Sequence, residues 1–302
     1  MAEMIALRLT APGDVDALAL ERVDVPGVAS GEALVRVRAA AITRDELDWP
    51  VDRLPAIPSY ELSGTIETLA PDASGVALGD AVYALTAFDR DGAAAEYTLA
   101  PAAVLAPKPR TLTHLESAAL PLAGLTAWQG LFDHGRLREG KRVLIHGATG
   151  GVGHLATQLA RWCGAYVIGT TNGAAVEEAR ELGAHEAVDR ERGRVEDAIE
   201  PVDLVFDTVG GDTLARSPSL LREGGRLVSV AEKPPVTDPV EGIYFVVEPS
   251  REQLVKLAGL VDEGRVRPMI DSVFPLTKAR EAFERVMMRG KRGKVVLQIA
   301  DE

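Results

Sequence analysis

The chain has 302 residues, and its 45 Asp and Glu against 33 Lys and Arg give a formal net charge of −12. A protein this acidic is repelled by phosphate backbones, so we expect no nucleic-acid partner. At about 150 residues per domain, the length predicts two domains. The single cysteine, Cys163, excludes an internal disulfide and a zinc site built from several cysteines.

The sequence also bears on where the protein works. The segment Met1–Arg8 has neither the basic region nor the long apolar stretch of a signal peptide. The sequence contains no window of about 18 uninterrupted apolar residues, so we expect no transmembrane helix. Because a lone cysteine is also typical of a reducing compartment, we expect a soluble cytoplasmic protein without a membrane partner.

Residues 1 to about 110 are predicted to be rich in strands and turns. Leu34–Ala39 and Gly64–Leu69 alternate apolar and polar side chains, which is the period of a strand with one buried face. Turn signals such as Pro12-Gly13-Asp14 and Ser74-Gly75 recur between them. Short strands at this spacing indicate a small barrel or sandwich.

The pattern changes near residue 110, where Thr113 and Glu116 predict a helix-capping box. Strands then alternate with helices. A buried strand at Arg142–His146 leads through a glycine-rich turn into an amphipathic helix over 151–163, and a strand follows at Tyr166–Gly169. This alternation indicates an α/β domain with a doubly wound parallel sheet.

The remaining elements continue this alternation to the end of the chain. Ser250 with Gln253 predicts the cap of one helix, Thr277 opens another, and Val295–Ile299 is the last strand. The other predicted strands are Ala187-Val188, Leu204–Phe206, Arg226–Val230 and Tyr244–Val247.

The glycine-rich turn carries the strongest chemical signal. Ala148, Gly150 and Gly153 form an A-x-G-x-x-G variant directly between an apolar strand and an amphipathic helix, the context that a dinucleotide site requires. Gly150 and Gly151 let backbone approach a pyrophosphate, and Gly153 lets the helix pack against the strand. Backbone N–H groups and the helix dipole then hold the diphosphate. The alternative is a loop that serves packing alone.

The type of dinucleotide depends on the end of the next strand. NAD sites usually carry an acidic residue about 20 residues past the fingerprint. Here Thr171 and Asn172 follow the strand and no acidic residue is present, which permits the 2′-phosphate of NADPH and leaves NADH possible. Arg190, after the third strand, is the candidate partner for that phosphate, or else a solvated surface arginine.

The sequence resembles the zinc-independent quinone oxidoreductases of the medium-chain dehydrogenase/reductase superfamily over essentially its whole length. This family has a GroES-like, β-rich catalytic domain around a doubly wound Rossmann domain. The resemblance therefore implies a GroES-like domain over 1–112 and 268–302, a Rossmann domain over 113–267, and nicotinamide in the cleft between them. The motifs that carry it are Ile57–Gly64, Gly79–Tyr83, Asp91–Tyr97, Ala119–Trp128, Val143–Gly153, Asp207–Gly211 and Gly293–Leu297.

The resemblance also bears on metal binding. The positions that match the catalytic zinc ligands of zinc-dependent relatives are Thr43, Tyr60 and Leu122, and none of them is Cys or His. The four-cysteine structural lobe of those relatives is absent, and the five histidines show no metal spacing. We therefore expect no metal site.

The resemblance further implies a set of cofactor contacts. Relatives often have a serine where Asn172 stands and a tyrosine where Arg190 stands, so the NADPH end departs from the family pattern. The implied cofactor-binding residues are Thr126, Gly150, Gly151, Val152, Thr171, Asn172, Arg190, Val209, Gly210, Val230, Ala231, Phe245, Val246 and Lys294.

Without a Lewis acid, hydride must go to an acceptor that is already electrophilic, such as a quinone or an enone. Tyr60, Thr43 and Arg44 are the candidate catalytic residues, because they lie where the zinc ligands would be; Tyr60 is alternatively an aromatic filler and Arg44 a solvated side chain. The alternatives to a quinone or enone reductase are an enoyl reductase of polyketide or fatty-acyl intermediates and a non-catalytic NADPH-binding protein. The edge strand Tyr244–Val247 and the resemblance predict a homodimer.

Overall fold

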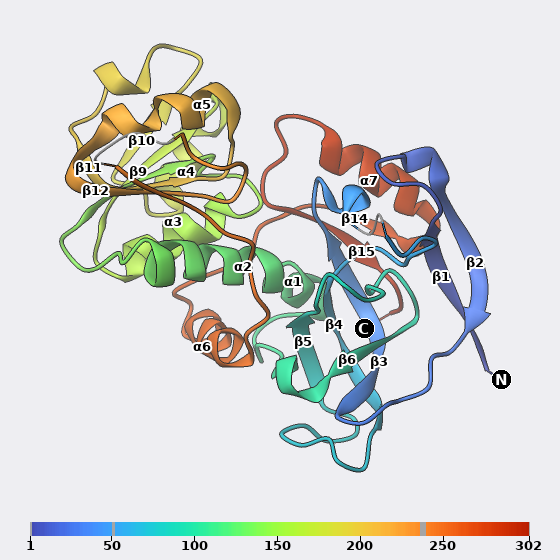
Figure 1. The fold of residues 1–302 in the computed structure, drawn as a ribbon. Helices are drawn as coiled ribbons and strands as arrows, with labels where there is room; N and C mark the ends of the chain where they lie inside the picture. Colours follow the sequence, from blue (N-terminus) through green and yellow to red (C-terminus); the bar gives the residue numbers. More distant parts are fainter. Residues whose placement is uncertain (1, 50–51, 236–239, 302) are drawn as a thin grey trace. The chain divides into compact units, whose positions relative to one another are not determined.

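The computed structural model describes residues 2–49, 52–235 and 240–301, and the chain divides into two compact units (Figure 1). The first unit comprises residues 1–122, 249–264 and 268–302, and the second comprises 123–248 and 265–267. The last segment of the first unit begins at residue 268, as in the predicted division, whereas residues 113–122 and 249–264, which the prediction placed in the Rossmann domain, belong to the first unit.

Packing explains why these two segments belong to the first unit. Helix α1 (His114–Ala118) lies against the sheet of that unit, and His114 Nδ1 is 2.7 Å from Ser63 Oγ. Helix α6 (Arg251–Asp262) accepts a 2.6 Å hydrogen bond from the Tyr83 hydroxyl at the Leu254 carbonyl. These long-range contacts do not appear in local patterns.

The first unit is built on a β-rich sheet with the strand order β14-β15-β3-β4-β5-β7, in which β6 also pairs with β3, and a separate β1-β2 hairpin. The predicted strands at 34–39 and 64–69 are confirmed. They extend further in the structure, where β3 and β4 pair from Ala33–Leu69 to Ala41–Glu61 with two register shifts. The strands are β1 (Glu3–Leu9), β2 (Leu18–Asp24), β3 (Glu32–Ile42), β4 (Glu61–Leu69), β5 (Ala81–Leu85), β6 (Tyr97–Pro101), β7 (Ala106–Pro107), β14 (Ile270–Pro275) and β15 (Lys294–Gln298).

The core of this unit closes between β1, β15 and the last helix, α7 (Ala279–Met287). Phe283 of α7 is fully buried among Leu7, Leu9 and Leu297. Apolar side chains at three- and four-residue spacing on α7 produce this packing, and the helix begins at Ala279 rather than at the predicted Thr277. Strand β14, absent from the prediction, runs parallel to β15.

The second unit contains a six-stranded parallel sheet in the order β10-β9-β8-β11-β12-β13. This is the order of a doubly wound dinucleotide-binding sheet, in which the topology reverses between the first and fourth strands, β8 and β11. The predicted fold class, α/β with a GroES-like unit and a Rossmann unit, is confirmed. The strands are β8 (Arg142–His146), β9 (Tyr166–Thr171), β10 (Glu186–Asp189), β11 (Val202–Asp207), β12 (Leu221–Ser229) and β13 (Glu241–Tyr244).

Three helix ends have recognisable capping residues. Helix α3 (Gly153–Trp162) ends before Gly164, whose φ of +81° suits a glycine at a helix C-terminus. Thr113 forms the predicted capping box with Glu116, and Ser250 caps α6 by accepting from the Gln253 N–H. The other helices are α2 (Pro121–Trp128), α4 (Val176–Glu181) and α5 (Gly211–Arg216), and a π-helical turn over Gln129–His134 extends α2.

The structure also bears on the predicted edge strand and on the search for membrane-spanning helices. The last strand of the parallel sheet is Glu241–Tyr244, so the strand predicted over Tyr244–Val247 was placed three residues too late. Its apolar residues alternate between burial and exposure after the strand has ended, since Phe245 and Val247 are buried and Val246 is 59% exposed. Across the described ranges, no helix is long and apolar enough to cross a membrane.

Candidate functional site

The glycine-rich turn lies at the carboxyl end of β8, at the reversal of the sheet order. Gly147 has a φ of +75°, and its N–H and that of Ala148 donate to the Thr170 carbonyl at 3.1 and 2.9 Å. A Cβ added to Gly153 would lie 2.0 Å from the Gly147 carbonyl oxygen, so only glycine fits at the start of α3. The close packing of α3 against the glycine-rich turn, which the glycine spacing predicts, is therefore present.

The turn is tied to the neighbouring strand as well. Thr149 Oγ1 lies 3.0 Å from Thr171 Oγ1 at the end of β9, and His146 Nδ1 lies 3.0 Å from Thr170 Oγ1. Gly150, Gly151 and Val152 are partly exposed immediately before α3. A partly exposed backbone at a helix N-terminus on the switch point of a parallel sheet fits a dinucleotide diphosphate.

The ends of β9 and β10 meet beside this turn. Asp189 pairs in register with Thr171, and a Cβ on Gly173 would lie 2.6 Å from Asp189 Oδ2. Within the described residues the buried Oδ1 atom of Asn172 has no hydrogen-bond partner. Arg190 is exposed, and its backbone N–H donates to the Thr171 carbonyl at 3.0 Å. The sequence prediction missed Asp189, because the spacing rule inspects only the strand that follows the fingerprint.

A buried aspartate organises the ends of β11 and β12. Asp207 is fully buried and accepts hydrogen bonds from Gly210 N at 3.1 Å, Val209 N at 3.3 Å and Ser229 Oγ at 2.9 Å. Burial raises the pKa of this carboxyl, and these donors oppose that rise. The Asp207 carbonyl also accepts from Val230 N, so one residue brings the two segments together.

Four of the predicted cofactor-binding residues directly follow these strands and are therefore neighbours: Val209, Gly210, Val230 and Ala231. Ala231 N donates to Ser229 Oγ at 3.2 Å, and Gly210 has a φ of +78°. Sequence reasoning quoted the Asp207 motif but did not assign the carboxylate a role. The signal was an acidic residue directly before a Gly-Gly pair.

Three other predicted cofactor residues have different settings. Thr126 is buried within α2. Phe245 is buried against His134, with ring centroids 4.4 Å apart, whereas Val246 is exposed. Lys294 belongs to the first unit, as the first residue of β15, and so lies among the candidate catalytic residues.

A buried charged cluster surrounds Thr43 in the first unit. Lys294 is 4% exposed; its Nζ donates to Thr43 Oγ1 at 3.0 Å and forms an ion pair with Glu61, which is fully buried. Glu61 also accepts from the Leu122 N–H at 3.0 Å. Two of the three positions that match zinc ligands, Thr43 and Leu122, are thus bound to this lysine–glutamate pair.

A second buried carboxylate, Glu46, fixes the backbone on both sides of the candidate catalytic residues. Its two oxygens accept from Thr43 N at 2.9 Å and from Ser59 N at 3.1 Å. Desolvation raises its pKa to about 8, while the backbone donors and Lys294 act in the opposite direction. Ser59 is held at a φ of +69°, and this directs the chain into Tyr60.

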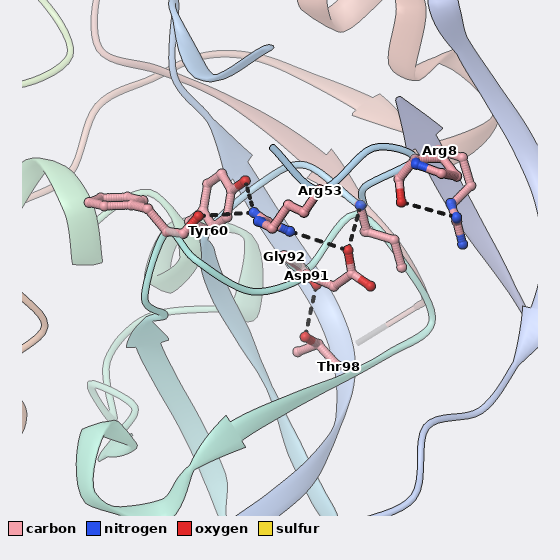
Figure 2. A network of polar contacts seen from close by, with 9 residues as sticks. Arg8, Arg53, Tyr60, Asp91, Gly92 and Thr98 are labelled. Carbon is pink, nitrogen blue, oxygen red and sulfur yellow. Dashed lines mark hydrogen bonds and ion pairs between the residues drawn. The ribbon is translucent and has the colours of Figure 1, made fainter. Parts of the chain in front are cut away.

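Tyr60 is fully buried and has a cationic partner (Figure 2). Arg53 donates from NH2 to the Tyr60 hydroxyl at 2.7 Å and to the Phe88 carbonyl at 2.9 Å, and its NH1 lies 3.6 Å from Asp91 Oδ1. Because arginine only donates, the phenol oxygen accepts and its own proton remains available to another acceptor. Burial raises the pKa of Tyr60 to about 12, so it stays protonated at neutral pH.

Aromatic packing holds this phenol in place. The Tyr60 ring centroid lies 5.6 Å from Trp49 and 5.3 Å from Phe88, and the latter two are 4.9 Å apart. Arg53 was missed by sequence reasoning, since an isolated arginine seven residues before Tyr60 has no pattern. Arg44, by contrast, is exposed and donates to the Met287 carbonyl at 2.8 Å.

The donor chemistry around Thr43 is unsuited to zinc. Leu122 has no donor atom, and the Thr43 hydroxyl already accepts from an ammonium group. Throughout residues 2–49, 52–235 and 240–301, no three His, Cys, Asp or Glu residues gather as a metal-binding group.

Comparison with known proteins finds family matches that include residues of both units. Residues 29–110 match the alcohol dehydrogenase GroES-like domain, and residues 182–297 match the zinc-binding dehydrogenase family. The solved structure of the quinone oxidoreductase from Coxiella burnetii has a TM-score of 0.92 and 31% identity, covering 99% of this chain and 100% of that one. The chain belongs to the quinone oxidoreductase family of the medium-chain dehydrogenase/reductase superfamily.

Two sequence relatives extend this comparison. The protein named "Probable zinc-binding oxidoreductase, mitochondrial" of Arthroderma benhamiae is 36% identical over 91% of this chain and 90% of its own length. The NADPH-dependent alkenal/one oxidoreductase, chloroplastic, of Arabidopsis thaliana is 32% identical over 94% of this chain and 77% of its own. As a member of this family, the chain is an oxidoreductase that uses a nicotinamide cofactor.

Proposed function

We propose that the protein is a zinc-independent, NADPH-dependent reductase that acts on quinones or α,β-unsaturated carbonyls. The observation that carries this proposal is the Lys294 ammonium, bound to Thr43 Oγ1 at 3.0 Å and paired with Glu61. A fixed cation opposes a second cation at the same place. The carbonyl acceptor must then be electrophilic by itself, as a quinone or an enone is. The relatives named as quinone and alkenal/one oxidoreductases support this substrate class.

In this proposal each unit has its own task. Bound NADPH supplies the hydride, and the residues of the glycine-rich turn hold its diphosphate. Tyr60 donates a hydrogen bond from its protonated phenol to the acceptor oxygen as negative charge develops there. Arg53 orients that phenol and, through its charge, eases transfer of the phenol proton. Glu46 positions Thr43 and Tyr60 through the backbone.

The test of Tyr60 is a Tyr60→Phe variant assayed with one quinone and one enone at saturating NADPH. We expect about a tenfold loss with the quinone, because a single neutral hydrogen bond contributes about 0.5–1.5 kcal/mol. The enone should lose more, since its enolate is more basic. Tyr83→Phe is the matched control, because this buried tyrosine donates to Leu254 and should leave both rates unchanged. Complete loss on both substrates, or loss on neither, contradicts the assignment.

A preference for NADPH is proposed from the second unit. The absence of an acidic residue directly after β9 and the exposed guanidinium of Arg190 support it, whereas Asp189 beside Gly173 opposes it. Arg190→Ala should weaken NADPH binding by about ten- to a hundredfold and leave NADH binding nearly unchanged. Asp189→Asn should tighten NADPH binding. Equal losses for both cofactors in a fluorescence titration of Arg190→Ala would remove this residue from the phosphate site.

A homodimer in the cytoplasm is proposed as the working form. In the described sheet β13 is an edge strand that pairs with β12, and Tyr244 at its end is 41% exposed. An edge of this kind offers unpaired backbone groups to a second copy. Analytical ultracentrifugation should give twice the chain mass of 32.1 kDa at micromolar concentration. A monomer at every concentration contradicts the dimer.

A further inference from the structure

A pocket in the first unit lies apart from every residue assigned above to the cofactor or to zinc-ligand positions. Its volume is about 430 Å³, within the range of small-molecule sites. It is formed by β1, β2, β6 and the loop 90–92. Its apolar lining includes Met4, Val23, Ile57, Tyr97 and Leu99.

The pocket contains one arginine whose charge has no carboxylate partner. Arg8, which lines the pocket, donates from NH2 to the Pro55 carbonyl at 3.1 Å. Its Nε is buried and has no hydrogen-bond acceptor, and no Asp or Glu oxygen of the described residues lies within ion-pair distance. The neighbouring arginines differ, since Arg90 pairs with Glu32 at 2.7 Å and Arg53 with Asp91 at 3.6 Å. Because the buried Nε is closed to the pocket, a ligand meets Arg8 at its terminal nitrogens, and a guanidinium without a carboxylate partner is best satisfied there by an anionic acceptor.

The lining also limits the charge of the ligand. Asp24, exposed, and Asp91 are part of the same pocket. Their negative charges oppose a multiply charged anion such as a phosphate ester, and the apolar walls favour a ligand with an apolar body. We propose that this pocket binds a monocarboxylic acid with an aromatic or branched apolar body, whose carboxylate pairs with Arg8.

Polar contacts lead from Asp91, which lines the pocket, through Arg53 to the candidate catalytic tyrosine (Figure 2). Asp91 Oδ1 accepts from the Ile57 N–H at 2.9 Å and lies 3.6 Å from Arg53 NH1, while Arg53 NH2 donates to the Tyr60 hydroxyl. An occupant that touches Ile57 and Asp91 therefore acts on the group that orients the phenol. The acid is then an effector that changes the rate of reduction, and this part of the inference rests on the proposed reductase function.

Binding is tested first, without turnover, by calorimetry on the full chain with 2-naphthoate as the probe. The uncharged 2-naphthamide has the same body and should bind at least about tenfold more weakly. Arg8→Gln should weaken 2-naphthoate by about tenfold or more, and Asp24→Asn should tighten it. Circular dichroism of Arg8→Gln checks that the variant is folded. Equal binding of the acid to the parent chain and Arg8→Gln, or of the acid and the amide to the parent chain, overturns the site.

Coupling is tested next by quinone reduction with and without 2-naphthoate. The acid should change kcat in the parent chain and leave Arg8→Gln unaffected, and the rate of Arg8→Gln without the acid should equal that of the parent. Binding that depends on Arg8 but leaves kcat unchanged overturns the coupling alone. Failure of the parent chain to reduce any quinone or enone overturns the proposed function, while calorimetry still decides the site.

Discussion

Replacing Lys294 by Met removes the cation from a cluster that holds two buried carboxylates. Lys294 and Glu61 are 4% and 0% exposed, and the ammonium is bound to both Glu61 and Thr43. The Glu61 charge would keep one partner in this cluster, the Leu122 N–H at 3.0 Å. Breaking a buried ion pair by removing one partner costs about 3–5 kcal/mol, because the remaining charge stays desolvated.

This cost is large against the stability of a typical domain, about 5–15 kcal/mol. We therefore expect Lys294→Met to lower the free energy of unfolding of the first unit by about 3–5 kcal/mol. The double variant Lys294→Met with Glu61→Gln should recover much of this loss, since no uncompensated charge remains. The double-mutant cycle measures the coupling directly.

The assay must report on the first unit, because two units can unfold separately. Trp49 lies in the first unit, and Trp128 and Trp162 lie in the second. A background with the latter two replaced by Phe leaves Trp49 fluorescence as the reporter during urea unfolding. This reasoning would be refuted if Lys294→Met lowered the free energy of unfolding by less than about 1 kcal/mol, showed no coupling to Glu61→Gln and weakened NADPH binding. Lys294 would then serve the cofactor, as the family resemblance implies.

Two other predictions concern residues of the second unit, and the first has its control in α6 of the first unit. Gly153→Ala should destabilise the protein by about 1–3 kcal/mol and weaken NADPH binding, because the added Cβ would meet the Gly147 carbonyl. Gly259→Ala is the control: nothing lies within 4 Å of the added Cβ, so this change should stabilise α6. An unfolding series and a cofactor titration on both variants measure this, and equal behaviour would contradict it. Burial lowers the pKa of His146 from 6.5 to about 4, so the unfolded chain binds more protons between these values. Stability should fall by about 3 kcal/mol as pH drops from 6.5 to 4, and His146→Asn should lose that pH dependence in urea unfolding; an unchanged slope would contradict it.

The sequence by itself determined the elements that depend on local patterns. Strand alternation predicted β3 and β4, the apolar run and glycine spacing predicted β8 and α3, and Thr113 with Glu116 predicted a capping box that the structure contains. These features follow from interactions within a few residues of one another, such as capping bonds and side-chain periodicity. The family and fold class followed from the same motifs.

Only the tertiary structure decided which charges are buried together and which strand ends meet. Lys294 reaches Thr43 across 251 positions of the chain, and Asp189 approaches Gly173 because β10 pairs with β9. Arg53 acquires its role from the packing of Tyr60 against Trp49 and Phe88. Desolvation and ion pairing depend on distances in space, which sheet pairing sets, so no local pattern in the sequence contains them.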